Sequence, residues 1–274
     1  MKAAAFDYLR PDSLDAAVGA LGRTDGAKPV GGAQSLGPML NLRLARPSVL
    51  VGLCHLDHLK SVTDVGEAWR IGAAVTHATI EDTGAGLTGC EMLADVARDI
   101  AYRSVRNRGT IGGSLVHADP AADWPLCLAT LGAEVEIEGP NGRRRCPVDG
   151  FMRAAFTVAL AQDEVVTAVV VPKVGSGSGW SYFKFCRKPG DFAQASAALL
   201  ICPPRRVARL FVGALDGAPV PLSGIVRQLA AGEPPDDATI DLALAGAVPA
   251  LDDVDRKMHV AAVRRAIERM SVTR

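Results

Sequence analysis

The chain has 274 residues, a length that suggests about two domains and is enough to bury a sizeable core. Its 30 Lys and Arg residues balance its 30 Asp and Glu residues. The neutral charge argues against nucleic acid or anionic membrane as a partner, and aromatic residues, at 5%, are too few for base stacking. No apolar stretch approaches the ~20 residues that span a bilayer. The first residues lack the apolar core of an export signal, so a cytoplasmic location is expected.

The first part of the chain mixes helical and strand-like periodicities. Ser13 and Thr76 are residues that cap helix N-termini, and Asn141-Gly142 after an alternating segment predicts a hairpin. Residues 103–114 are expected to form a loop. The patterns predict helices over 13–22, 76–82, 90–102 and 124–131, and strands over 49–51, 69–73, 133–138 and 165–171.

A Gly- and Ser-rich connector over 172–179 precedes a second group of elements. Strands mixed with helices and followed by a helical tail indicate an α+β protein with two domains. In this group the patterns predict strands over 181–185, 195–201 and 207–215, and helices over 222–231, 238–246 and 252–270.

The cysteines and histidines show no metal-site spacing. No two of the six cysteines are closer than 16 positions, whereas Fe–S and structural zinc sites usually contain close pairs. His55 and His58 can share a helix face, but no carboxylate–histidine pattern supports a metal there. We therefore expect buried, free thiols and no metal in this chain.

One glycine motif lacks the neighbouring residues that a dinucleotide-binding site requires. Residues 84–89 match G-x-G-x-x-G, but the preceding residues are predicted as helix and no acidic residue lies at 104–110. A dinucleotide fingerprint needs a preceding strand and an acidic residue about 20 positions later. The segment is predicted to be an ordinary turn between helices.

Two other glycine segments carry more information. The first is Gly31-Gly32-Ala33-Gln34-Ser35-Leu36, and the second spans 106–114 and contains Gly112-Gly113. Adjacent glycines allow backbone N–H groups to converge on a bulky anion, and nearby hydroxyls of Ser35, Thr110 and Ser114 can add hydrogen bonds. Two such loops can hold a diphosphate from two sides, although either loop alone is better explained as a tight turn.

The two loops carry a family resemblance. The segment from Thr110 to Pro125 resembles the second FAD-binding loop of the FAD (medium) subunit of molybdenum hydroxylases, the family of xanthine dehydrogenase, aldehyde oxidase and carbon monoxide dehydrogenase. The first loop with the segment 42–47 is similar to that family's first FAD loop. Three further matches follow in order and extend the resemblance over nearly the whole chain: Ile71-Gly72-Ala73 with Thr76-His77, Phe183-Lys184 with Arg187, and the run 190–193.

The resemblance implies a two-part FAD-binding domain of the xanthine-dehydrogenase (PCMH) type at 1–174, with subdomains of about 1–55 and 56–174. A smaller C-terminal domain of sheet and helices is expected at 180–274. It also implies the cofactor-binding residues, which are Gly31, Gly32, Ala33, Gln34, Ser35, Leu36, Ile100, Thr110, Ile111, Gly112, Gly113, Ser114, Asp123, Val166, Lys184 and Phe192.

Several of these residues have individual roles by resemblance. Ile100 and Val166 are expected to make apolar contacts, and Asp123 to accept hydrogen bonds on the cofactor's sugar or adenine side. Lys184 is expected near the flavin, where a cation favours the anionic reduced form. Phe192 is expected to control access of the electron acceptor. The alternatives are a helix N-cap for Asp123, a solvated strand lysine for Lys184 and core packing for Phe192.

One position departs from the family. Its first loop usually has Ala-Gly-Gly where this chain has Gly31-Gly32-Ala33. If the third position needs a positive φ, alanine there costs about 1 kcal/mol, unless a small register shift of the loop avoids it. The departure bears on FAD affinity rather than on the identity of the cofactor.

The resemblance implies that this chain is the subunit through which electrons leave a larger complex. FAD would take electrons from a small [2Fe-2S] subunit and pass them to NAD, oxygen or a quinone, while a large molybdenum-cofactor subunit hydroxylates the substrate. The complex would be a dimer of three-chain units, a heterohexamer. Because the flavin carries the redox chemistry, no side chain of this chain need be catalytic.

Two other functions stay open. One is a stand-alone FAD oxidoreductase of the same wider superfamily, which would need its own acid or base beside the flavin. The other is a non-catalytic scaffold that docks through Arg103, Arg106 and Arg108 or through 143–145, although 143–145 is expected to be a solvated hairpin face. Flavin colour in the purified protein separates the enzymes from the scaffold.

Overall fold

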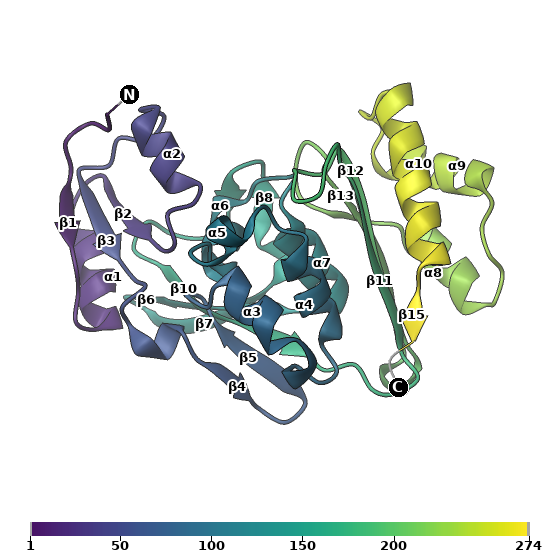
Figure 1. Cartoon of the computed structure of the whole chain (residues 1–274), viewed down its shortest axis with the longest axis horizontal. Coiled ribbons are helices and arrows are strands. Elements are labelled where there is room, and N and C mark those ends of the chain that lie inside the picture. The colour runs from purple at the N-terminus through teal and green to yellow at the C-terminus, as the bar shows by residue number, and fades with distance from the viewer. Residues whose placement is uncertain (1, 273–274) are drawn as a thin grey trace.

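The computed structural model describes residues 2–272 and arranges them in three parts that lie in a row (Figure 1). The N-terminal part is a small parallel sheet with strand order β1-β3-β2. Its helix α1 is capped by the Ser13 hydroxyl, which accepts from the amide of Ala16, and it buries one apolar face on the sheet. The elements are β1 (Asp7–Leu9), α1 (Leu14–Arg23), β2 (Ala27–Val30), α2 (Leu36–Asn41) and β3 (Val49–Gly52).

The central part packs helices against one face of an antiparallel sheet with strand order β4-β5-β10-β6-β7 (Figure 1). Trp124 is fully buried in its core. The strands are β4 (Val62–Asp64), β5 (Ala68–Gly72), β6 (Glu134–Gly139), β7 (Gly142–Pro147) and β10 (Val165–Pro172), with the separate hairpin β8 (Met152–Ala154) and β9 (Thr157–Val158). The helices are α3 (His77–Thr83), α4 (Glu91–Arg98), α5 (Arg103–Arg106), α6 (Ile111–His117) and α7 (Asp123–Leu131).

The third part is a sheet with strand order β14-β13-β12-β11-β15. Its middle strand is apolar on both faces: Ala197 and Leu199 pack toward the C-terminal helices, while Ala198 and Leu200 pack into the core of the central part. The elements are β11 (Gly179–Phe185), β12 (Ala195–Cys202), β13 (Val207–Gly213), β14 (Val220–Pro221), α8 (Ser223–Ala230), α9 (Asp237–Ala247), α10 (Asp253–Glu268) and β15 (Ser271–Val272).

Most of the predicted elements are confirmed, including both helix caps, the hairpin at Asn141-Gly142 and the three C-terminal helices. The turn predicted at 84–89 lies between α3 and α4 as expected. The prediction of buried thiols is correct for Cys90, Cys127 and Cys202 but wrong for Cys54, which is exposed. No helix within residues 2–272 is long and apolar enough to cross a membrane.

Two predictions near residue 100 are wrong. The helix predicted over 90–102 ends at Arg98, and the expected loop at 103–114 contains α5 and the start of α6. Long-range contacts explain both, because the Arg106 guanidinium bonds Glu81 on α3 and the carbonyls of Ile100 and Ala101. This anchor turns the chain out of α4 and fixes a short helix that local periodicity is too brief to predict.

A buried ion pair joins the central part to the third part. The Lys184 ammonium on β11 lies 3.1 Å from Oδ1 of Asp123 at the start of α7, and it also donates to the carbonyl oxygen of Asp99. The Tyr182 hydroxyl donates to the same Asp123 oxygen at 2.6 Å. Burial raises the pKa of Asp123, and Lys184 and Tyr182 act against that rise.

Replacing Lys184 with methionine would leave the Asp123 carboxylate buried without its cation. We expect a loss of about 3 kcal/mol in the free energy of unfolding near neutral pH. A raised carboxyl pKa means that the folded chain binds the proton more tightly than the unfolded chain, so the loss should shrink as pH falls from about 7 toward 5. Urea denaturation at several pH values measures this.

The control is Lys60→Met, which removes an exposed pair with Asp57 and should leave stability nearly unchanged. Equal losses in the two variants, or a Lys184→Met loss that does not depend on pH, would contradict the prediction.

Candidate functional site

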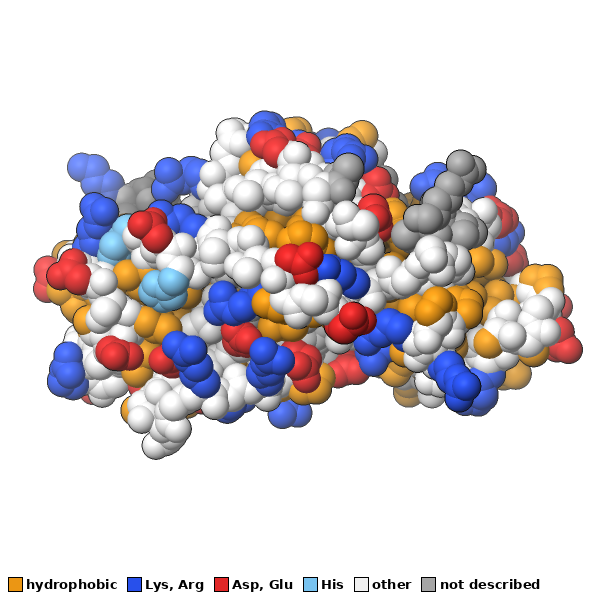
Figure 2. Space-filling view, turned by 90° about the horizontal axis from the view of Figure 1, so that it is seen from below, with side chains coloured by type: hydrophobic (Ala, Val, Ile, Leu, Met, Phe, Trp, Pro, Cys, Tyr) orange, Lys and Arg blue, Asp and Glu red, His pale blue; other side chains and the backbone are white. Residues whose placement is uncertain are grey.

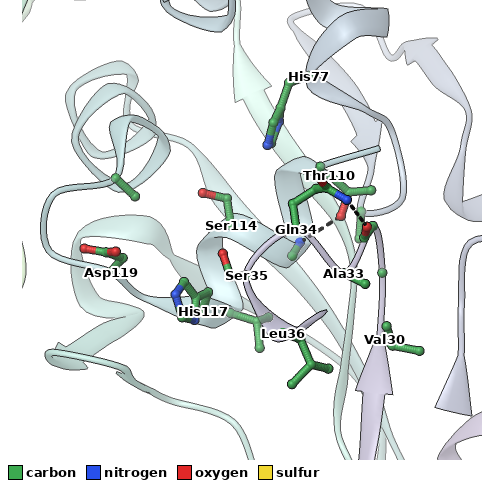
Figure 3. A pocket seen from close by; sticks show the side chains of 18 of the residues that line it. Val30, Ala33, Gln34, Ser35, Leu36, His77, Thr110, Ser114, His117 and Asp119 are labelled. Carbon is green, nitrogen blue, oxygen red and sulfur yellow. Dashed lines mark hydrogen bonds between the residues drawn. The ribbon is translucent and has the colours of Figure 1, made fainter. Parts of the chain in front are cut away.

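A cavity of about 530 Å³ lies where the three parts of the molecule meet. The N-terminal part contributes the turn between β2 and α2, and the central part contributes the start of α6 and strand β10. The loop between β11 and β12 reaches the rim. Both glycine segments line the cavity, and Figure 3 shows side chains from the two segments facing the same space.

The first loop, Gly31–Leu36, offers a row of free backbone donors. None of its six N–H groups donates a hydrogen bond to another atom of residues 2–272. Only Gly32 of the six residues is buried, so these amides are open to the cavity or to solvent and can donate to an acceptor that binds there. Gln34 holds the loop in shape, because its Nε2 donates to the carbonyl oxygen of Gly32 at 3.0 Å.

Ala33 adopts the left-handed conformation, with φ of 58°. The positive φ anticipated at this position is therefore present, and alanine bears its cost of about 1 kcal/mol. The loop does not shift register to avoid it. Its carbonyl oxygen accepts the amide of Gly37 at 2.8 Å, which starts the short helix α2.

The two loops touch through their backbones. A Cβ added at Gly32 would overlap the carbonyl oxygen of Arg108 and lie 2.9 Å from the amide of Gly109. A Cβ at Gly31 would lie 2.9 Å from the Thr110 hydroxyl oxygen. Glycine is thus required at Gly32 because the second loop occupies the space of a side chain.

The second loop does not present its amides as expected. The N–H groups of Ile111 and Gly112 donate to the carbonyls of Val75 and Ala73, and that of Gly113 donates to the Thr110 hydroxyl. Gly112 serves close packing, since an added Cβ would lie 2.8 Å from the Ala73 oxygen. The segment is the capped start of a helix docked on a strand, not a second open cradle.

Two hydroxyls supply the polar atoms that the second loop's amides do not. Ser35 and Ser114 both line the cavity, and neither hydroxyl has a hydrogen-bond partner within the described chain. Figure 3 shows them close together on the two segments. Together with the first-loop amides they form a donor-rich wall suited to an anionic ligand.

The other predicted residues divide into two groups. Ile100, Asp123, Val166 and Phe192 line the cavity, whereas Ile111 and Lys184 do not. Ile111 is fully buried behind the wall. The Lys184 ammonium donates to Asp123 and Asp99, and its expected place near the flavin stays a prediction. The alternative of a solvated lysine is wrong because the side chain is 5% exposed.

Asp123 is the first residue of α7, yet it does not cap the helix. Its carboxylate accepts from Tyr182 and Lys184 and still has acceptor capacity on the cavity side, since an ionised carboxylate offers about four lone-pair positions. Phe192 is 64% exposed at the rim, so core packing does not explain it.

Several wall residues were not predicted as site residues. They include His77, His117, Asp119, Phe156 and Glu164. Three of them lie within or beside quoted motifs: His77 follows Thr76, and His117 and Asp119 follow the second glycine pair. Phe156 and Glu164 carry no sequence signal, because only the fold brings the hairpin β8–β9 and the start of β10 to the cavity.

Most arginines of the two clusters are paired with carboxylates, and Arg108 is the exception among the described residues. Arg103 and Arg106 bond Glu81 and Asp82, and on the hairpin Arg144 bonds Glu164 and Arg145 bonds Glu136. The face in Figure 2 shows basic and acidic side chains interspersed rather than one basic field. These observations do not favour the docking scaffold.

The comparisons with known proteins point in one direction. Residues 4–174 match the family described as "FAD binding domain in molybdopterin dehydrogenase". The chain is 38% identical over 201 residues to the nicotine 6-hydroxylase medium subunit of Paenarthrobacter nicotinovorans, which covers 73% of this chain and 70% of that one. It is 31% identical over 276 residues to the carbon monoxide dehydrogenase medium chain of Afipia carboxidovorans, covering 96% of each.

A solved structure agrees over the whole chain. The carbon monoxide dehydrogenase of Hydrogenophaga pseudoflava contains a chain that matches with a TM-score of 0.88 at 31% identity, covering 98% of each chain. This chain belongs to the FAD-binding subunit family of the molybdenum hydroxylases. It is an oxidoreductase subunit, and its fold is the mixed helix-and-sheet fold expected for that family.

The cavity fits the cofactor of the family. FAD is a dinucleotide with an anionic diphosphate, and the unpaired amides of the first loop and the free hydroxyls of Ser35 and Ser114 are donors of the kind that bind phosphate oxygens. Apolar side chains of Ile100 and Val166 lie farther along the wall, as an aromatic ring system requires.

Gly32→Ala should disrupt the contact between the loops. The added methyl group would push the Arg108 backbone away, and we expect FAD affinity to fall at least about tenfold, with a loss of roughly 1–3 kcal/mol in stability. Gly37→Ala is the matched control, because nothing lies within 4 Å of an added Cβ there. Flavin fluorescence titration and urea denaturation measure both quantities. Wild-type affinity in Gly32→Ala would contradict the prediction.

Ala33→Gly should relieve the left-handed alanine. The gain of about 1 kcal/mol in the folded state is partly offset by the greater freedom of glycine in the unfolded chain, so we expect a net stabilisation of about 0.5 kcal/mol. Ala16→Gly in helix α1 should instead destabilise by up to about 1 kcal/mol. Paired denaturation curves test this; destabilisation by both substitutions would show that Ala33 is not strained.

Proposed function

We propose that this chain is the FAD-carrying electron-transfer subunit of a three-chain molybdenum hydroxylase. It takes electrons from a small [2Fe-2S] subunit and passes them to an external acceptor such as NAD, oxygen or a quinone, while a large molybdenum-cofactor subunit hydroxylates the substrate. The observation that carries the proposal is the unpaired amide row of the first loop, set in a cavity that the second loop closes.

The proposed binding residues follow from the cavity wall. The amides of Gly31–Leu36 and the hydroxyls of Ser35 and Ser114 bind the diphosphate, and Asp123 accepts from a sugar hydroxyl. Thr110, Gly112 and Gly113 shape the start of α6 behind Ser114, and Ile111 anchors it in the core. Ile100 and Val166 provide apolar contacts.

When bound, FAD supplies the electron-accepting and electron-donating chemistry, and the protein supplies position and electrostatics. The buried Lys184 acts on the site through Asp123, because its cation opposes the rise in the carboxyl pKa that burial causes. Phe192 at the rim controls how closely an acceptor approaches, and the rate of acceptor reduction by Phe192→Ala measures that role.

The assembly in this proposal is a cytoplasmic dimer of heterotrimers. Similarity to medium subunits and medium chains of carbon monoxide dehydrogenase and nicotine hydroxylase supports partner chains. The 28.6 kDa chain would then be one component of a much larger particle.

FAD uptake and assembly test the proposal in two steps. The purified full chain should turn yellow on addition of FAD and bind one equivalent, as followed by flavin absorbance and fluorescence quenching. A tagged chain recovered from its native host should carry two further chains, with molybdenum and iron detected by elemental analysis. A chain that takes up no FAD would overturn the proposal, and one that binds FAD but recovers no metal-containing partners would support a stand-alone flavoprotein.

A further inference from the structure

His77 is a buried imidazole in the cavity wall that no step of the proposed function uses. It is the first residue of α3, directly after the cap Thr76, and its backbone N–H donates to the carbonyl oxygen of Gly109 at 2.9 Å. Its side chain is only 5% exposed, and that exposure is toward the cavity. Figure 3 shows the ring reaching into the pocket on the side where Thr110 and Ser114 lie.

Trp124 fixes the protonation of this ring. Its indole Nε1–H donates to Nδ1 of His77 at 3.0 Å. An indole nitrogen can only donate, so Nδ1 must be unprotonated, and the single proton of the neutral ring is on Nε2. Burial, aided by the nearby Arg106 cation, lowers the pKa of His77 to about 4, so the ring is neutral at physiological pH.

The Nε2–H donor has no acceptor within residues 2–272. The structure makes room for this edge of the ring, because a Cβ added at Gly109 would lie 2.8 Å from both Nε2 and Cδ2. Gly109 is also the residue whose amide lies against Gly32, where the two loops touch. The unpaired donor is therefore located at the junction of the loops, with its tautomer already set. Because His77 lines the cavity and its Nε2–H donates to no protein atom, this donor is available to a ligand atom that enters the cavity.

We infer that His77 binds the cofactor, donating a hydrogen bond from Nε2–H to a diphosphate oxygen of FAD where the two loops meet, and that Trp124 is the positioning residue that holds His77 in the donating tautomer. The inference rests on the proposed function. A neutral donor adds specificity for an oxygen acceptor without adding a fixed charge to the site.

Binding measurements with matched variants test the inference. His77→Phe keeps a ring but removes the donor, and FAD affinity should fall about tenfold. His77→Gln retains an N–H donor and should recover most of the affinity. Trp124→Phe keeps an aromatic ring in the core but frees the tautomer, and should weaken FAD binding by a smaller factor. Thermal unfolding of each ligand-free chain identifies variants that merely destabilise the fold.

Two fragment ligands locate the acceptor. ADP contains the diphosphate, whereas riboflavin lacks any phosphate. The His77→Phe loss should appear with ADP and not with riboflavin. A loss confined to riboflavin would overturn the assignment to the diphosphate, and wild-type affinity of stably folded His77→Phe for FAD would overturn the role of His77 altogether.

Nitrogen NMR of isotope-labelled histidines gives a readout that does not depend on activity. In the free chain Nδ1 of His77 should be unprotonated and Nε2 protonated, and added FAD should shift the Nε2–H proton and slow its exchange with water. Protonation at Nδ1, or an Nε2–H signal unchanged by saturating FAD, would overturn the inference. If the wild-type chain binds no FAD, the proposed function fails, while the tautomer measurement still reports on the Trp124 contact.

Discussion

The backbone of Gly32 lies against the carbonyl oxygen of Arg108, and the cavity depends on that contact. The two segments come from different parts of the molecule and are about 80 positions apart in sequence. Because no side chain separates them, the open amides of the first loop and the hydroxyl of Ser114 border one space. The two loops use their amides differently. Those of the first loop are free donors, whereas those of Ile111 and Gly112 donate to Val75 and Ala73 and so hold α6 against the residues that follow β5.

Much of this arrangement was accessible from the sequence. The apolar run at 195–201 predicts strand β12, and the alternating glutamates of β6 with Asn141-Gly142 predict the hairpin. The two glycine segments predict the cavity wall because both occur with hydroxyl residues and both line the cavity. The family pattern leaves two possibilities at Ala33, a left-handed alanine or a shifted loop, and the structure has the left-handed alanine.

Contacts between residues that are distant in the sequence could not be predicted from local patterns. The short helix α5 exists because Arg106 bonds α3 and the carbonyls of Ile100 and Ala101, which no local pattern encodes. The ion pair of Lys184 with Asp123, 61 positions earlier, is another contact that no local pattern encodes. The second glycine pair does not form an open cradle, because the Gly112 amide donates to the carbonyl of Ala73, 39 positions earlier, and the Gly113 amide donates to the Thr110 hydroxyl.

Because β12 is buried on both faces, the C-terminal part of the chain cannot be removed without exposing apolar residues of the central part. Residues of one strand serve the core beneath the C-terminal helices and the core beside α7 at once. Removing the chain after the glycine-rich connector would expose an apolar surface on the helices around Trp124, next to the cavity. The C-terminal sheet therefore shields an apolar face of the FAD-binding domain. A truncated domain would need polar substitutions on that face to resist aggregation.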